Sequence, residues 1–167
     1  LFRIGAAFRL VGEAKIYTAL DYWTFQKRRK RPPIPQIESI DLSDSCAMIT
    51  GFKHLNGLTQ VKSMKINHCD YLESPAFSHL VNIKSTLENL EIVSCGNIGD
   101  LAVEPLKYLK NLRRLHLYML PHISDRKKTL GELRSALPRC HVTFPPTTTL
   151  SGEGWSEASP RTRKARK

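Results

Sequence analysis

Four cysteines and six histidines are the side chains of this sequence that are best suited to chemistry. Thiols form disulfides, bind zinc or act in redox reactions. No Cys-x-x-Cys pair is present, so a structural zinc site is not predicted. Two interpretations of Cys46, Cys69 and Cys95 stay open. They are either buried free thiols in a reducing compartment, or Cys69 and Cys95 form a redox-active or metal-binding pair.

The other polar residues do not form a recognisable catalytic set. The sequence has no Gly-rich phosphate loop, no Gly-x-Ser-x-Gly, no His-Glu-x-x-His and no paired carboxylates. His116 and His141 are expected in one row of side chains, where two stacked imidazoles are weak evidence for a ligand site. We therefore predict a binding module and not an enzyme.

A repeated pattern supplies the elements that position these residues. Residues 87–98 read Leu87-x-x-Leu90-x-Ile92-x-x-Cys95-x-x-Ile98, and related strings begin at residues 37, 61 and 112. The periods of 24, 26 and 25 residues are typical of leucine-rich repeats. One such unit buries too little apolar surface to be stable alone, so we expect the units to stack.

The cysteines fall at defined places in this pattern. Cys69 and Cys95 occupy the same slot of consecutive units, and Leu120 takes the slot in the next one. Cys46 comes one residue late, which predicts a wider first turn. A fifth partial copy, Leu137-x-x-Cys140-x-Val142, is expected to follow 25 residues after the fourth.

These observations predict an α/β fold, a short leucine-rich repeat solenoid of about four cysteine-containing repeats. Its parallel sheet lines the concave face and its helices lie outside. We expect three parts: a basic helical N-terminal cap at 1–35, the repeat domain at 36–144, and a disordered basic tail at 145–167. The chain begins at Leu1 and not at Met, so we expect a fragment or a processed form.

Charge is concentrated at the two ends of the chain. The net charge is +11, of which residues 1–33 carry +6 and residues 145–167 carry +3. The spacing of Leu10, Ala14, Tyr17 and Leu20 predicts an amphipathic helix, followed by aromatic residues and the basic run at 27–31. Such a segment suits an anionic membrane surface or an acidic protein, and equally a cap that covers the first repeat. Nucleic acid is not a predicted partner, because no recognised nucleic-acid module accompanies the basic run.

The strand residues that point away from the core form rows across the sheet. The central row is expected to read Asp41, Lys65, Glu91, His116 and His141, with a cross-strand charge ladder from Asp41 to His116. Arg114 and Tyr118 lie in the flanking rows. We predict that these seven residues form a protein-docking surface on the concave face, although an ordinary solvated face has the same pattern.

Two longer strings go beyond the generic repeat. Asp44-Ser-Cys-Ala-Met-Ile-Thr-Gly-Phe-Lys-His54 and Glu91-Ile-Val-Ser-Cys-Gly-Asn-Ile-Gly-Asp100 resemble the mitochondrial ATP synthase subunit s family, also called coupling factor B. The resemblance covers about residues 36–144.

The resemblance implies a non-catalytic protein on the matrix side of the mitochondrial inner membrane, and we expect it to be a monomer. It would bind the membrane sector of ATP synthase and keep proton flow coupled to ATP synthesis. The resemblance also implies a role for the thiols Cys46, Cys69 and Cys95 in that coupling. Finally, it implies a magnesium ion held by backbone atoms at Ser43, with Gly12 as the second position.

Two other functions stay open at this point. A sister family with similar repeats assists assembly of the distal membrane arm of complex I, whose assembly intermediates would then be the partner. Adaptors of ubiquitin ligases also use cysteine-containing repeats, but they carry an F-box-like helical segment for which residues 1–33 are too short and too basic.

Overall fold

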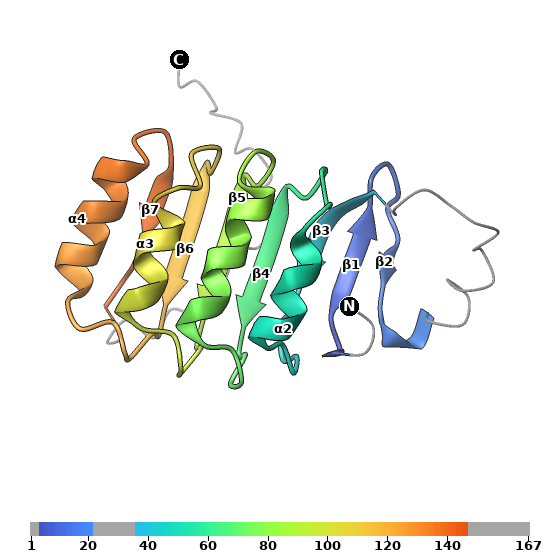
Figure 1. Ribbon diagram of the computed structural model, residues 1–167, viewed down its shortest axis with the longest axis horizontal. Coiled ribbons are helices and arrows are strands. Elements are labelled where there is room, and N and C mark those ends of the chain that lie inside the picture. Colours follow the sequence, from blue (N-terminus) through green and yellow to red (C-terminus); the bar gives the residue numbers. More distant parts are fainter. Residues whose placement is uncertain (1–3, 22–35, 147–167) are drawn as a thin grey trace, which may run out of the picture.

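The computed structural model describes residues 4–21 and 36–146. Its strands are β1 (Ala7–Leu10), β2 (Ile16–Tyr17), β3 (Ile37–Asp41), β4 (Ser63–Asn67), β5 (Asn89–Val93), β6 (Arg114–Tyr118) and β7 (His141–Thr143). They form one seven-stranded sheet in the order β2-β1-β3-β4-β5-β6-β7 (Figure 1). Strands β3 to β7 pair in parallel, whereas β1 is antiparallel to both β2 and β3. The predicted α/β class with a mostly parallel sheet is confirmed.

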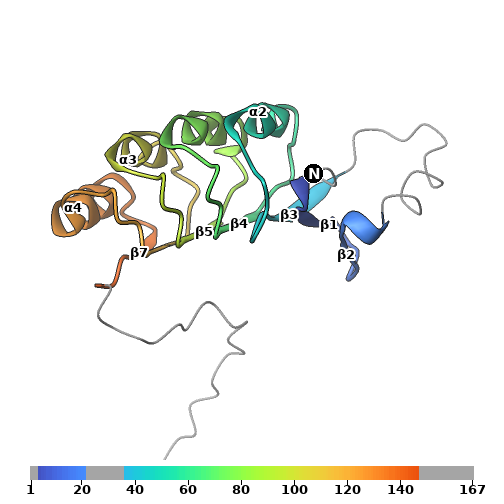
Figure 2. The same ribbon diagram turned by 90° about the horizontal axis from the view of Figure 1, so that it is seen from below.

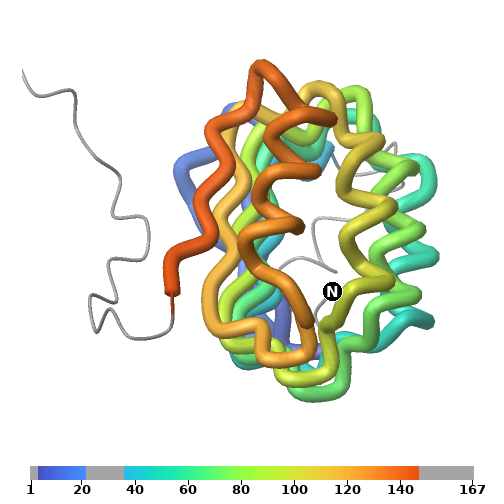
Figure 3. The backbone as a smooth tube through the Cα atoms, turned by 90° about the vertical axis from the view of Figure 1, so that its left-hand side faces the viewer, coloured from blue at the N-terminus to red at the C-terminus, as the bar shows by residue number. Residues whose placement is uncertain are grey.

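The connections between the parallel strands contain short helices. These are α2 (Ile49–Phe52), η3 (Lys53–Leu55), η4 (Ser74–Ile83), η5 (Asp100–Ala102), α3 (Val103–Leu106) and α4 (Arg126–Ala136), and η2 (Ala19–Asp21) follows β2. The helices between β3 and β7 cover one face of the sheet (Figure 2), and end-on they form a second layer beside it (Figure 3). In the described residues no helix is both long and apolar enough to cross a bilayer. The opposite face of the sheet is called the open face below.

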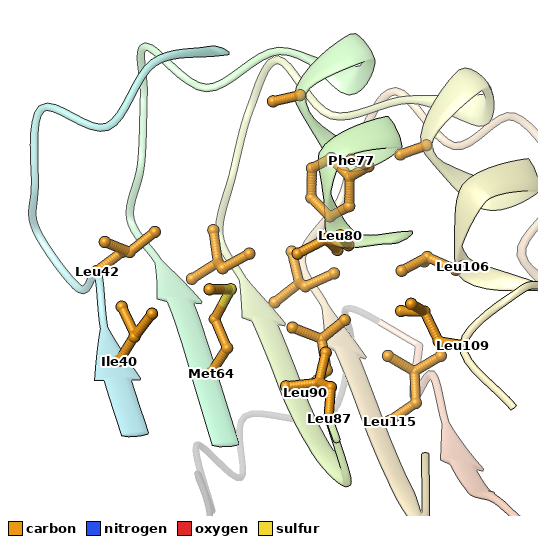
Figure 4. Close-up of a cluster of buried hydrophobic side chains, with 14 of the residues drawn as sticks. Ile40, Leu42, Met64, Phe77, Leu80, Leu87, Leu90, Leu106, Leu109 and Leu115 are labelled. Carbon is orange, nitrogen blue, oxygen red and sulfur yellow. The ribbon is translucent and has the colours of Figure 1, made fainter. Parts of the chain in front are cut away.

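The core lies between the sheet and the helices. Ile40, Met64, Leu90 and Leu115 point from four neighbouring strands toward the helical layer, where Phe77 is fully buried (Figure 4). These strand positions are the second aliphatic position of the repeated pattern, and the period of two along a strand sends them all to the same side. The pattern therefore sets which face of β3 to β6 is buried.

The N-terminal segment is a β-hairpin, so the prediction of a helix over residues 10–20 was wrong. Phe8 and Tyr17 stack with ring centroids 5.6 Å apart and are 4% and 1% exposed. Strand β1 pairs with β3 from Ala7 to Leu10, and Gly12 adopts a positive φ of 76° in the connecting turn. The physical reason is that β3 would otherwise leave a row of backbone groups unpaired, which a helix cannot satisfy.

The hairpin covers the first repeat strand, as a cap would, but with a different secondary structure. The aromatic residues 22–25, the basic run 27–31 and the predicted disordered stretch from 147 onward lie outside the described residues.

The last strand is two residues out of the predicted register. Leu115 pairs with Val142 and His116 pairs with Thr143, whereas the pattern had placed His116 beside His141. Phe144, 5% exposed, therefore follows Val142 into the core, and Cys140 precedes the strand. The longer connection accommodates α4, which has 11 residues where α2 and α3 have 4 each.

Candidate functional site

The open face carries the predicted row of polar residues through four strands. Asp41 is the register partner of Lys65, Lys65 of Glu91, and Glu91 of His116. The fifth member of this row is Thr143, because His141 pairs with Arg114 and is exposed at the edge of the sheet. The structure thus brings together Asp41, Lys65, Glu91, Arg114, His116 and Tyr118, and it separates His141 from His116.

The charge ladder predicted along this row does not form. Asp41 Oδ1 accepts hydrogen bonds from the backbone N–H and the hydroxyl of Ser43, at 2.9 and 2.6 Å. Glu91 Oε1 accepts one from Asn67 Nδ2 at 2.8 Å. Lys65 makes no salt bridge with any residue that the structure describes. The carboxylates on either side of Lys65 thus bond to other neighbours, Asp41 to the turn after β3 and Glu91 to the adjacent strand β4.

Ion pairs form instead between side chains of alternating charge at the edge where the parallel strands begin. Arg9 and Lys62 approach Glu38 at 3.3 and 3.5 Å, and Arg113 approaches Glu88 at 3.5 Å. These side chains have more room to turn toward each other than those in the half-buried central row. Sequence spacing could not distinguish the two rows, because both carry charges of alternating sign.

His116 links strands β6 and β7 on the open face. Its Nδ1 lies 2.7 Å from Thr143 Oγ1, and its ring stacks on Tyr118 with centroids 6.4 Å apart. Burial lowers the pKa of His116, and the nearby Glu91 carboxylate opposes that shift. The imidazole is therefore held mainly in its neutral form at neutral pH. Thr143 belongs to this site, but the repeated spacing placed His141 beside His116 instead, because the longer connection through α4 could not be read from spacing.

Two shallow hollows flank Lys65 on the open face. One, of about 250 Å³, is lined by Ser63, Asn89, Glu91 and Arg114 together with Lys65. The other, of about 320 Å³, lies over β1 and β3 and includes Phe8, Arg9 and Ile16. Lys65 is shared by both. Its ammonium and the guanidinium of Arg114 are suited to an acidic side chain, and the apolar wall beside β1 is suited to an aliphatic one.

The thiols Cys69 and Cys95 are completely buried, each at the end of a strand. Cys69 Sγ donates to the carbonyl of Leu42 at 3.0 Å, and Cys95 Sγ donates to that of Ile66 at 3.3 Å. Each thiol thus bonds to the backbone of the preceding unit and links two neighbouring units. All four cysteines are free, and no disulfide forms between these two.

Ser45, and not Cys46, fills the equivalent slot of the first turn. Ser45 is 5% exposed and its Oγ lies 3.9 Å from Cys69 Sγ, whereas Cys46 is exposed. The residue before each slot has a positive φ, which is 54° at Asp44, 52° at His68 and 53° at Ser94. The three turns therefore have the same geometry, and the predicted wider first turn is wrong.

The pair of buried thiols ionises unequally. Interaction with the neighbouring Cys69 thiol, followed by burial, raises the pKa of Cys95, while interaction with Cys95 lowers the pKa of Cys69. Burial raises the pKa of Cys140 to about 11. Cys46 lies on the surface, apart from this pair, so the three thiols named from the sequence do not form one cluster.

The magnesium site implied by the family resemblance does not fit Ser43 and Gly12. The pairing of Ala7 with Asp41 and of Leu10 with Ile37 places Gly12 beyond one end of β3 and Ser43 beyond the other. Ser43 lies six residues after Ile37, the partner of Leu10, so Ser43 and Gly12 are roughly 20 Å apart, whereas magnesium ligands lie about 2 Å from the ion. Gly5 is the glycine beside the Ser43 turn, since the carbonyl of the preceding Ile4 accepts a hydrogen bond from Cys46 N. No group of three or more potential side-chain metal ligands occurs in the described residues.

The sequence is similar to curated proteins of one name. It is 34% identical over 144 residues to "ATP synthase subunit s, mitochondrial" of Homo sapiens, which covers 83% of this chain and 68% of that protein. The Bos taurus protein of the same name is 32% identical over 144 residues, which also cover 83% of this chain and 68% of that protein. The Rattus norvegicus protein is 40% identical over 106 residues, covering 62% of this chain and 53% of the relative. No protein-family model matches the sequence.

Proposed function

The chain belongs to the family of mitochondrial ATP synthase subunit s, and we propose that it is a non-catalytic mitochondrial protein that binds ATP synthase and helps couple proton flow to ATP synthesis. The observation that carries this proposal is the shared name of relatives that are similar over 83% of the chain. In this proposal the protein is a monomer on the matrix side of the inner membrane. It contacts the anionic lipid surface and the membrane sector of the enzyme from outside the bilayer.

We further propose that the row of units from β3 to β7 is a leucine-rich repeat solenoid, with the open face as its concave side. The parallel pairing of β3 to β7 and the placement of the helices on one face support this. A residue with positive φ at the equivalent place after each of β3 to β6 also supports this. Met119, with a φ of 49°, is the fourth such residue, after Asp44, His68 and Ser94. Solenoids of this kind use the concave face to bind proteins.

Two polar groups that lack partners among the described residues support the open face as the docking surface. Lys65 has no salt bridge to any described residue, and Asn67 Oδ1 is buried without a hydrogen-bond partner there. A buried polar group without a partner costs free energy, so a bound protein that donates to Asn67 and places a carboxylate near Lys65 would be stabilised. The two hollows beside Lys65 provide the space for such side chains.

Affinity capture of the tagged full chain from mitochondria tests this function. We expect ATP synthase subunits to be recovered with the parent chain, and several-fold less with Arg114→Glu, because the exposed Arg114 lines the hollow beside Lys65. Lys128→Glu is the matched control, since it makes the same charge change at an exposed position of α4. Glu91 is less suitable for substitution, because at 8% exposure its loss would also disturb packing.

Two outcomes would contradict the proposal. Recovery of complex I assembly intermediates without ATP synthase subunits would replace it with the assembly function. Recovery of ATP synthase that is equal for Arg114→Glu and Lys128→Glu, with both variants folded, would leave the family function in place but remove the open face as its docking surface.

A further inference from the structure

The two edges of the sheet differ sharply in charge. The segments that lead into β4 to β7, at residues 53–62, 84–88, 107–113 and 137–140, carry seven Lys or Arg residues and one carboxylate, Glu88. The turns that follow β3 to β6, at residues 42–48, 68–73, 94–100 and 119–125, contain no Lys or Arg. Their five carboxylates are Asp44, Asp70, Glu73, Asp100 and Asp125. The first edge is at the top of Figure 1 and is called the basic edge.

Most cations of the basic edge are not neutralised by carboxylates. Lys107 is the exception and is neutralised, because its Nζ lies 2.8 Å from Glu104 and 2.9 Å from Glu132. The remaining six are Lys53, Lys62, Lys84, Lys110, Arg113 and Arg139. Of these, only Lys62 and Arg113 form salt bridges within the described residues, both at 3.5 Å and with side chains 50% and 74% exposed. Pairs so long and exposed are weak and open easily.

A recess lies at the centre of this edge. It has a volume of about 620 Å³ and is lined by four cations, Lys62, Lys110, Arg113 and Arg139, by the single carboxylate Glu88, and by the hydroxyls of Ser85 and Thr86. The Lys110 ammonium donates to the neutral carbonyl of Ala136 at 2.8 Å and keeps its charge uncompensated. Ammonium, guanidinium and hydroxyl donors around an open recess are suited to phosphate oxygens.

We propose that the basic edge is the surface that lies against an anionic phospholipid bilayer, with lipid phosphates bound in and around the recess. The proposal deepens the peripheral membrane location given above and rests on it. It places the contact on the folded domain, whereas the sequence had indicated the N-terminal segment.

The distribution of charge favours a bilayer over an acidic protein. The cations extend along the starts of four neighbouring strands, which lie about 4.8 Å apart, and do not converge on one point. Tyr108, 55% exposed, stands between Lys107 and Lys110 in sequence, and aromatic rings beside cations are typical of membrane interfaces. Among the described residues, the turns at the opposite edge carry carboxylates and no Lys or Arg, and this difference in charge would orient the fold on a planar negative surface.

Vesicle co-sedimentation with the full chain tests this proposal. The probes are vesicles of equal parts phosphatidylcholine and phosphatidylglycerol, and vesicles of phosphatidylcholine alone. We expect the parent chain to bind the anionic vesicles only, and Lys110→Gln with Arg139→Gln to bind them roughly 30-fold more weakly, at about 1 kcal/mol for each cation removed. The control is Lys127→Gln with Lys128→Gln, which removes the same charge from α4 beside the carboxylate-rich turns and should bind like the parent.

All three proteins retain the basic residues 27–31 and 161–167, so any difference between them comes from the folded domain. Equal losses for the two double variants would overturn the proposal, because net charge and not the basic edge would then decide binding. Unchanged vesicle binding together with weaker capture of ATP synthase by Lys110→Gln with Arg139→Gln would assign the edge to an acidic protein instead. Failure to capture ATP synthase with normal vesicle binding would contradict the proposed function alone.

Discussion

Glu91 keeps a carboxylate on the open face with little access to water. It is 8% exposed, and its Oε1 is held by Asn67 Nδ2 at 2.8 Å. A buried charge without a partner would be costly, so this amide has a clear structural role. On its other side Glu91 faces His116, which burial holds neutral and which would become a second partner if protonated.

His116 makes the stability of the protein depend on pH. Burial lowers the pKa of His116 in the folded state. The unfolded chain therefore binds more protons than the folded chain as the pH falls below about 6.5, and the free energy of unfolding decreases. We expect His116→Gln to reduce the loss of unfolding free energy between about pH 7.5 and about pH 5 in urea titrations. His54→Gln, at an exposed position, serves as the control. An unchanged pH dependence in His116→Gln would refute this role.

Cys95 contributes to stability through its hydrogen bond and its packing. Cys95→Ala removes a buried donor that lies 3.3 Å from the Ile66 carbonyl, and we expect a loss of about 1–3 kcal/mol in the free energy of unfolding. Cys46→Ala, on the surface, should change it by less than about 0.5 kcal/mol. Denaturant titration measures both. If Cys95→Ala had the same free energy of unfolding as the parent chain but no longer captured ATP synthase, the thiol would have a chemical role and not a structural one.

At the scale of elements, both ends of the sheet are protected. The hairpin β1–β2 pairs with β3, and two arginines of α4 cover the outer side of β7. Arg134 Nη2 donates to the Val142 carbonyl at 3.1 Å, and Arg126 Nη1 donates to that of Phe144. An uncovered edge strand is a template for pairing with another chain, so these contacts favour a monomer.

Removing the two guanidinium groups should open this edge. We expect Arg126→Ala with Arg134→Ala to lower the free energy of unfolding by about 1–3 kcal/mol and to cause self-association at high concentration, because the carbonyls of Val142 and Phe144 lose their donors. Size-exclusion chromatography with light scattering measures the association. Lys127→Ala, exposed on the same helix, should remain a monomer. A double variant as monomeric as this control would show that the arginines do not protect the strand.

At the scale of the whole molecule, one core runs from the hairpin to the last strand. Phe8 and Tyr17 at one end and Leu137 and Phe144 at the other belong to the same cluster of buried side chains. The sheet on this core separates two edges of opposite charge and presents the open face between them. The proposed contacts with lipid and with protein thus use different surfaces, and one molecule can make both at once.

The sequence by itself determined which side chains of β3 to β6 face the core and which face the open side. It also determined that Cys69 and Cys95 occupy equivalent positions of consecutive units. Both follow from the spacing of apolar residues, since a strand alternates its side chains and a constant period aligns successive strands. The rows from Asp41 to His116 could therefore be predicted without the structure.

Only the tertiary structure decided the features that depend on partners distant in sequence. The free edge of β3 selected strands for residues 7–17, although the local spacing also suits a helix. The longer connection through α4 moved Thr143 into the place expected for His141. The left-handed residue Asp44 placed Ser45 in the slot expected for Cys46. In each case a non-local pairing or a backbone conformation outweighed side-chain spacing, because spacing records which way a side chain faces and not what it meets there.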